Sequence, residues 1–329
     1  MISRISRQLL AKQNAETSSA LIEQLGTSEA FSFLSLREQE AILKRDQEDS
    51  VKLDKGIEFA KAKGVLDKNY VAQPYVSIDV LGKTPSLVAD GIIGSVKTDS
   101  NGESGDGSVI VLCGLSGTGK GTTVKMLEEK LTSDEGKQVV CWSNGNIFRS
   151  VTLLAVTWCE QQEGLGAFDK DRALTKENLE TFMGMLTFGK YNGKYDTHIH
   201  GLGLDLYISE VQNTELKSPK VSDNIPTVAE VTQGEVVSFA AGAVDTMGKD
   251  GIVVLLEGRE QTVDFVRTPH RFTLVLSDES LIGKRRAAQR VMAAALEVTS
   301  DESTDDEVGK ALEACTEKFA IEAGYQPAN

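Results

Sequence analysis

Short runs of β-branched and apolar residues, each ending in polar or glycine-rich sequence, recur along the chain from residue 109 onward. Runs of this length predict buried strands. They cover residues 109–113, 138–142, 251–257 and 271–276. Helix-competent segments follow the first two strands, at residues 122–131 and 150–158. Strands that alternate with helices in this way predict an α/β fold with a doubly wound parallel sheet.

The first 98 residues carry a different, mainly helical pattern. Residues 35–38, Ser-Leu-Arg-Glu, form a capping box and predict the start of a helix. Residues 75–80 alternate as a half-buried strand does, and Thr84-Pro85 then supplies an N-cap followed by proline at the first position of another helix. We find no catalytic constellation in this segment. We therefore expect a helical extension that packs on the main domain or on a partner protein.

Residues 99–107, Asp-Ser-Asn-Gly-Glu-Ser-Gly-Asp-Gly, have the composition of a flexible linker. They predict three parts: a mainly helical N-terminal extension over 1–98, the linker over 99–107, and the main domain over 108–329. The first 26 residues are basic and amphipathic, with no acidic residue before Glu16. They fit either an organelle presequence or the first helix of the mature protein.

Composition and charge narrow the class of protein. With 40% apolar and 26% charged residues, the chain resembles an ordinary soluble globular protein. No apolar run approaches the roughly 18 residues of a membrane span, so we expect no membrane association. Four scattered cysteines without a C-x-x-C pair favour reduced thiols in an intracellular, cytoplasmic protein, with a mitochondrion or another organelle as the alternative. The net charge of −14 argues against nucleic acid binding, and a pocket for an anion must be locally basic.

The strand 109–113 runs into the glycine-rich segment Gly114-Leu-Ser-Gly-Thr-Gly-Lys-Gly-Thr-Thr123. A buried strand, a glycine turn and a helix N-terminus together form a phosphate-binding P-loop. The glycines let successive backbone N–H groups face one anion, Lys120 adds a flexible positive charge, and Thr122 is placed to offer its hydroxyl to Mg²⁺. The residues expected to bind nucleotide phosphates are Gly114, Ser116, Gly117, Thr118, Gly119, Lys120, Gly121, Thr122 and Thr123.

Gly121 separates Lys120 from the threonine, and the resulting G-x-x-G-x-G-K-G-T loop resembles that of nucleoside monophosphate kinases. Three later segments extend the resemblance to the cytidylate kinases. They are Ser143-Asn-Gly-Asn-Ile-Phe-Arg149, Gly258-Arg-Glu260 and Lys284-Arg-Arg286. Their order and spacing agree with the family over residues 108–320. The resemblance implies a P-loop kinase that uses ATP and Mg²⁺ to phosphorylate a nucleoside monophosphate such as CMP or dCMP.

The resemblance also implies a set of acceptor-binding residues. Arg149 and Arg259 match arginines that grip the phosphate of the acceptor, and a forked guanidinium suits phosphate oxygens. Asn144 lies in the family's acceptor-binding segment, and Glu260 stands where the family has an aspartate facing the acceptor nucleoside. For the two arginines, the alternative is a surface salt bridge.

The catalytic candidates are all cationic. Lys120 holds the donor phosphates, while Arg285 and Arg286 match basic residues that open the family's lid helix. Phosphoryl transfer requires positive charge where the transferring oxygens gather negative charge, which is the role implied for both arginines. A solvated helix face is the alternative for this pair. Glu257 either neutralises a nearby lysine or orders Mg²⁺ through water.

Residues 196–226 interrupt the alternation of strands and helices. Apolar and polar residues alternate there, which predicts a small antiparallel sheet. The resemblance implies a small inserted β-rich subdomain that binds and closes over the monophosphate. His198 and His200 share one face of a strand. Without a cysteine or a third ligand nearby, we expect no metal site there.

One departure from the family leaves the function open. The family's later lid motif, rich in Arg and Asp, is missing, since no arginine follows Arg290. That loss removes charge expected at the transition state. Three interpretations therefore stand. The chain is a nucleoside monophosphate kinase, or a nucleotide-binding pseudokinase that joins a larger assembly through residues 1–98, or a P-loop kinase of another small molecule.

Overall fold

The computed structural model describes residues 5–13, 15–99, 107–165 and 167–327. Its centre is a five-stranded, all-parallel sheet with the strand order β1-β8-β2-β7-β3. The four strands predicted from residue 109 onward are all present, which confirms the α/β class. The strands are β1 (Val76–Asp79), β2 (Val109–Gly114), β3 (Val139–Trp142), β7 (Val253–Glu257) and β8 (Arg271–Val275).

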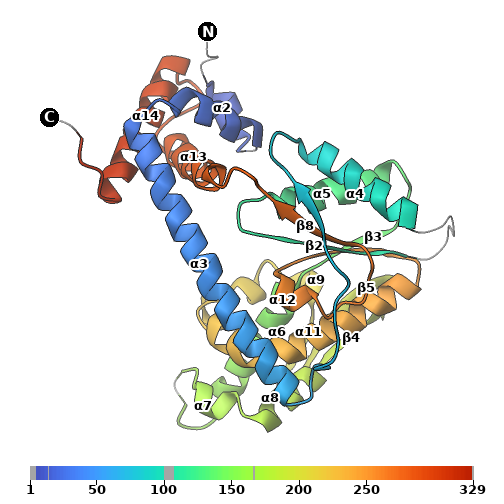
Figure 1. The fold of residues 1–329 in the computed structure, drawn as a ribbon. Coiled ribbons are helices and arrows are strands. Elements are labelled where there is room, and N and C mark those ends of the chain that lie inside the picture. Colours follow the sequence, from blue (N-terminus) through green and yellow to red (C-terminus); the bar gives the residue numbers. More distant parts are fainter. Residues whose placement is uncertain (1–4, 14, 100–106, 166, 328–329) are drawn as a thin grey trace.

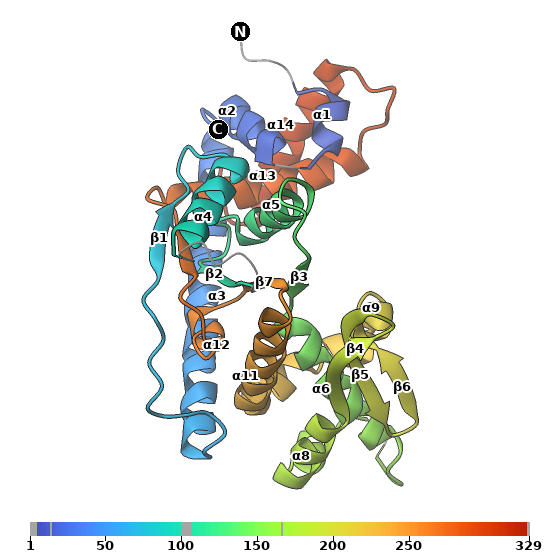
Figure 2. The same ribbon diagram turned by 90° about the vertical axis from the view of Figure 1, so that its right-hand side faces the viewer.

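Helices cover both faces of this sheet (Figures 1 and 2). On β2, Ile110 and Leu112 pack with residues of α4 (Pro85–Asp99) and α5 (Lys120–Ser133). The alternate residues Val111 and Cys113 pack on the opposite side, with α6 (Asn144–Glu160) and α11 (Ile225–Lys249). Since a strand turns successive side chains to opposite faces, a strand between two helical layers is apolar throughout.

The N-terminal segment contributes directly to the central sheet. Strand β1 pairs in parallel with β8, with Val76 opposite Phe272, and forms one edge of the sheet. Helix α4 begins at Pro85, and Leu87 N donates to Thr84 Oγ1 at 3.3 Å, which confirms the predicted cap. Residues before and after the predicted linker therefore share one sheet and one core. Of that linker, residues 100–106 lie outside the described residues.

A single long helix, α3 (Glu29–Ala62), crosses the molecule diagonally (Figure 1). It starts at the N-cap Ser28, whose Oγ accepts a hydrogen bond from Phe31 N at 3.3 Å. The predicted start at residues 35–38 is therefore wrong, and Ser35 lies buried inside the helix. Helix α13 (Ser280–Glu297) packs closely against α3 at Ser35. A Cβ added at Gly283 would lie 2.0 Å from Ser35 O, which shows how closely the two helices approach. The helix thus starts at the Ser28 cap and continues through the predicted capping box.

Both ends of the chain gather around α13. Helices α1 (Arg7–Ala11) and α2 (Ala15–Leu25) and the C-terminal α14 (Asp305–Glu322) share one apolar cluster with it. Ile5 and Leu10, within the basic N-terminal stretch, are fully buried in this cluster. Among the described residues, no helix combines the length and apolar character needed to cross a membrane.

A second, antiparallel sheet lies apart from the central one (Figure 2). It comprises β4 (Leu186–Tyr191), β5 (Lys194–Gly201) and β6 (Leu204–Tyr207). The predicted small sheet over 196–226 is thus present but displaced toward the N-terminus. Beyond Tyr207 the chain forms short helical segments instead: α9 (Ile208–Val211), η1 (Glu215–Lys217) and α10 (Pro219–Ser222). Helices α7 (Lys170–Ala173) and α8 (Lys176–Gly184) precede the sheet.

Candidate phosphate-binding site

The glycine-rich loop adopts the conformation that its sequence predicts. It leaves β2 at Gly114 and enters α5 at Lys120, and Gly114, Gly117 and Gly119 have φ values of 140°, 84° and 90°. Other residues rarely adopt such values. A side chain at Gly114 would also collide with the β8 backbone, because an added Cβ would lie 2.4 Å from Leu274 O. The glycines are therefore required for the shape of the loop.

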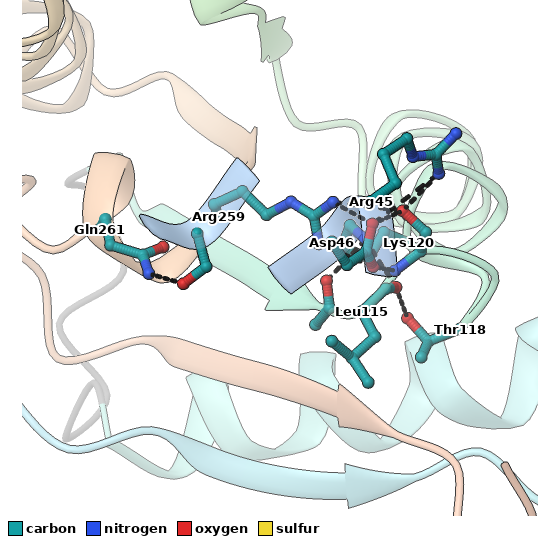
Figure 3. Close-up of polar contacts among 10 residues, drawn as sticks. Arg45, Asp46, Leu115, Thr118, Lys120, Arg259 and Gln261 are labelled. Carbon is teal, nitrogen blue, oxygen red and sulfur yellow. Dashed lines mark hydrogen bonds and ion pairs between the residues drawn. The ribbon is translucent and has the colours of Figure 1, made fainter. Parts of the chain in front are cut away.

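Lys120 points back over this loop (Figure 3). Its Nζ donates to Gly114 O at 2.8 Å and to Leu115 O at 2.9 Å. Burial lowers the pKa of Lys120, and the nearby Arg259 guanidinium lowers it further. The ammonium group is thus held at the loop rather than on the open surface.

A cavity of about 570 Å³ opens beside the loop, and every residue from Ser116 to Thr123 lines it. This volume lies within the range typical of small-molecule sites. Lys83, Lys120 and Arg285 bring three cations to its wall, although the chain carries a net charge of −14. The N-terminus of α5 opens at the same place, and helix N-termini bind anions through their free N–H groups. The cavity is therefore locally basic, as an anion site must be.

Oxygen donors for a divalent cation also line this cavity. Thr122 lies in the first turn of α5, and Glu257 ends the neighbouring strand β7. The Glu257 carboxylate lies near that turn, with Oε2 3.8 Å from the position a Cβ on Gly121 would take. A hydroxyl and a carboxylate suit Mg²⁺, which prefers hard oxygen ligands. These residues fit the metal that the loop implies.

Of the two candidate arginines on α13, one reaches the loop. Arg285 lines the cavity, and its Nη1 donates to Gly117 O at 3.3 Å. Burial lowers its pKa. Arg286 is exposed and does not line the cavity. One residue along a helix turns the side chain by about 100°, so Arg286 leaves α13 on a different face from Arg285.

Helix α3 brings an acid to the loop that the sequence analysis missed. Asp46 is 4% exposed and accepts hydrogen bonds from Ser116 N at 2.7 Å and from Ser116 Oγ at 2.8 Å. Arg259 donates to both oxygens of the same carboxylate, from Nη1 to Oδ2 at 3.1 Å and from Nη2 to Oδ1 at 2.5 Å (Figure 3). Burial alone would raise the pKa of Asp46, but the hydrogen bonds from Arg259 and Ser116 outweigh it and hold the pKa well below its usual range.

Arg45, the residue before Asp46, adds a further guanidinium. Its Nη2 donates to Ser116 Oγ at 3.2 Å. An N-terminal helix therefore brings positive charge to the loop, which the absence of arginine after Arg290 did not indicate. No local sequence signal marks Arg45 and Asp46, because their partner Ser116 lies 71 and 70 residues further along the chain.

A second cavity, of about 320 Å³, lies against the other side of the loop. Gly114, Leu115 and Thr118 line it together with Arg259 and Glu260. Arg259 is the N-cap of α12 (Glu260–Val263), which directly follows β7. The structure thus places two of the predicted acceptor-binding residues next to the loop, with Arg259 already paired to Asp46.

The remaining acceptor candidates, Asn144 and Arg149, do not line either cavity beside the loop. Asn144 begins α6 and is 9% exposed, and its Oδ1 accepts a hydrogen bond from Trp142 Nε1 at 2.8 Å. Arg149 lies in the second turn of α6, where its Nη1 donates to Asn146 Oδ1 at 3.4 Å. The helix starts at Asn144 rather than at residue 150. Asn144 therefore has a structural partner.

This chain matches no known protein-family model, and a search of curated proteins finds no relative. Its function must therefore be inferred from the loop, the two cavities and the charges around them.

Proposed function

We propose that this protein binds ATP with Mg²⁺ at the glycine-rich loop and transfers the γ-phosphoryl group to a nucleoside monophosphate. One observation carries the proposal. The loop has glycines at the three positions that take positive φ values, and the Lys120 side chain folds over it. It faces a cavity of about 570 Å³ that is lined by three cationic side chains. The resemblance to cytidylate kinases favours CMP or dCMP as the acceptor.

In this proposal the donor lies in the larger cavity. The loop N–H groups and Lys120 bind its β- and γ-phosphates. Arg285, anchored at Gly117 O, stabilises the charge that gathers on the transferring oxygens. Thr122 and Glu257 hold Mg²⁺, which neutralises phosphate charge when bound. Arg45 lies at Ser116 on the other flank of the loop and adds to the same field.

The acceptor is assigned to the smaller cavity across the loop. Arg259 and Glu260 line it, and Arg259 lies 3.3 Å from Ser116 Oγ. A phosphate bound by Arg259 is therefore adjacent to the donor's terminal phosphate. Transfer between two bound phosphates depends mainly on alignment and on exclusion of water rather than on a protein base.

A second function, nucleotide binding without transfer as a subunit of a larger assembly, is favoured by the Asp46 contact. The Asp46 carboxylate already binds one loop N–H and both arms of Arg259. An acceptor phosphate at Arg259 has to compete with this built-in anion. If the competition fails, ATP still binds in the larger cavity but no acceptor is phosphorylated.

A coupled ADP-release assay with ATP, Mg²⁺ and a panel of monophosphates distinguishes the two functions. Phosphorylation of an acceptor supports the kinase. Stabilisation by ATP with every acceptor inert supports binding alone. Lys120→Ala should abolish turnover and the ATP-induced rise in Tm, whereas Lys125→Ala, exposed on the same helix, should retain both. Unchanged turnover in Lys120→Ala would exclude this site.

A further inference from the structure

A cluster of potential metal ligands lies on the small antiparallel sheet, separate from the glycine-rich loop. His198 and His200 are two residues apart on β5, so their side chains share one face. Strand β6 places Asp205 directly opposite His200. The potential ligand atoms of the three residues all lie within 4.8 Å of one another. The structure thus supplies the third ligand that the sequence pattern did not show.

The hairpin that joins β5 to β6 fixes this arrangement. Gly201 pairs with Leu204, leaving a two-residue turn, Leu202-Gly203, with φ values of 54° and 78°. Positive φ at both positions is the turn geometry that suits the twist of a tight hairpin. The pair formed by His200 and Asp205 is the next one along the ladder. Its register therefore does not depend on a long loop.

One of the two imidazoles is also held in place by packing. The ring of His198 stacks on Tyr207, with centroids 4.7 Å apart and planes 18° apart, and meets the edge of Tyr191 at 5.8 Å. Its side chain is 21% exposed, whereas His200 and Asp205 are 69% and 73% exposed. A fixed inner ligand with two adjustable outer ligands leaves the outward coordination positions open to water.

The two distances from the imidazole nitrogens to Asp205 lie on either side of the ligand spacing in a tetrahedral zinc site. Zinc bonds of about 2.0–2.2 Å place neighbouring ligands about 3.3 Å apart. His200 Nδ1 lies 3.7 Å from Asp205 Oδ1. His198 Nε2 lies 2.5 Å from the same oxygen and is hydrogen-bonded to it. Rotation of the exposed Asp205 side chain away from His198 would break this hydrogen bond and make room for a metal ion among the three ligands.

We propose that His198, His200 and Asp205 form a binding site for a first-row divalent transition ion, with Zn²⁺ as its natural probe and water completing the coordination. Two imidazoles and one carboxylate are the ligand types that zinc takes in open, three-residue sites. Imidazole also disfavours Mg²⁺ and Ca²⁺, which prefer oxygen ligands. This site is independent of the function proposed for the loop.

The test is calorimetric titration of the tag-free, metal-stripped full chain with Zn²⁺, in excess Mg²⁺ so that oxygen-only sites are occupied. One equivalent should bind per chain. His200→Ala and Asp205→Asn should each weaken binding by at least about 100-fold, since loss of even an outer-shell partner costs about 10–100-fold. Asp171→Asn, an exposed carboxylate on α7, is the matched control and should bind as the wild type does.

A spectroscopic measurement provides a second test of the same site. Co²⁺ bound by these ligands should give visible absorption bands that are lost in His200→Ala while the circular dichroism of the variant stays native. Absence of saturable Zn²⁺ binding to the wild type would overturn the proposal. Undiminished binding by both folded ligand variants would overturn it equally, because the metal would then lie elsewhere.

Discussion

Replacing Asp46 with alanine should destabilise the protein by about 3 kcal/mol. The carboxylate is 4% exposed and accepts four hydrogen bonds, two from Ser116 and two from Arg259. Removing one partner of a buried ion pair costs about 3–5 kcal/mol, because the remaining charge is left uncompensated. The Arg259 side chain keeps 25% of its exposure, so water can solvate it in part. The lower end of the range therefore applies.

This loss is large enough to measure as a shift in Tm. Unfolding entropies near 2.1 cal/mol/K per residue give about 0.7 kcal/mol/K for a chain of 329 residues. A loss of about 3 kcal/mol then lowers Tm by about 4 °C. Scanning calorimetry without ligand is the assay. Glu48→Ala on the same helix is the control, since the exposed Glu48 pairs with the exposed Lys44 at 4.0 Å, and the Tm of this variant should change by less than about 1 °C. If Asp46→Ala melted with the wild type, the contact between α3 and the loop would not hold in solution.

The remaining predictions concern pH, the arginines of α13 and chain order. The pKa of Asp46 is lower in the folded than in the unfolded state, so its carboxylate stabilises the folded protein fully above about pH 4 and loses this effect as the pH falls further. The Tm difference between wild type and Asp46→Ala should therefore narrow in thermal melts at acidic pH. Arg285→Ala should weaken ATP binding about tenfold in a titration, through loss of a charge-assisted contact, whereas Arg286→Ala should leave it unchanged. Joining the two termini through a long flexible linker and opening the chain within residues 100–106 should give a protein with nearly the same Tm and ATP response, because Ile5 and Tyr325, near the two ends, pack in one cluster around α13. An insoluble product would contradict this.

Local sequence was sufficient to predict much of the fold. The runs 109–113 and 253–256 are apolar throughout because helices cover both faces of their strands, so their burial shows in the sequence itself. The glycine-rich loop could also be predicted from local sequence, because its lysine and the glycines that take positive φ values lie within ten residues of one another. The start of α3 could not be predicted from local sequence. Ser35 has the neighbours of a capping residue, but the helix is capped earlier by Ser28, and Ser35 lies buried beside Gly283 of α13.

The parts of the site that escaped prediction depend on contacts between distant segments. Asp46 and Ser116 are 70 residues apart, and Asp46 and Arg259 are 213 apart. No spacing rule links such positions before the path of α3 is known. Arg285 and Arg286 are adjacent and chemically identical, so only the orientation of α13 shows which of them faces the cavity.

The position of a segment in the chain is a poor guide to its role in this protein. Strand β1 and helix α4 precede the glycine-rich loop in sequence, yet β1 completes the sheet beside β8, one of the last strands. Helix α3 precedes both and carries Arg45 and Asp46 to Ser116. Parallel strands are joined by crossover connections, so strands that lie side by side in the sheet can be far apart in the sequence. The absence of arginine after Arg290 therefore gives no measure of the charge at the loop. In the proposed function, phosphate binding and transfer depend on the balance of charge at the loop. The guanidinium groups of Arg45, Arg259 and Arg285 supply its positive side, and the buried carboxylate of Asp46 opposes them.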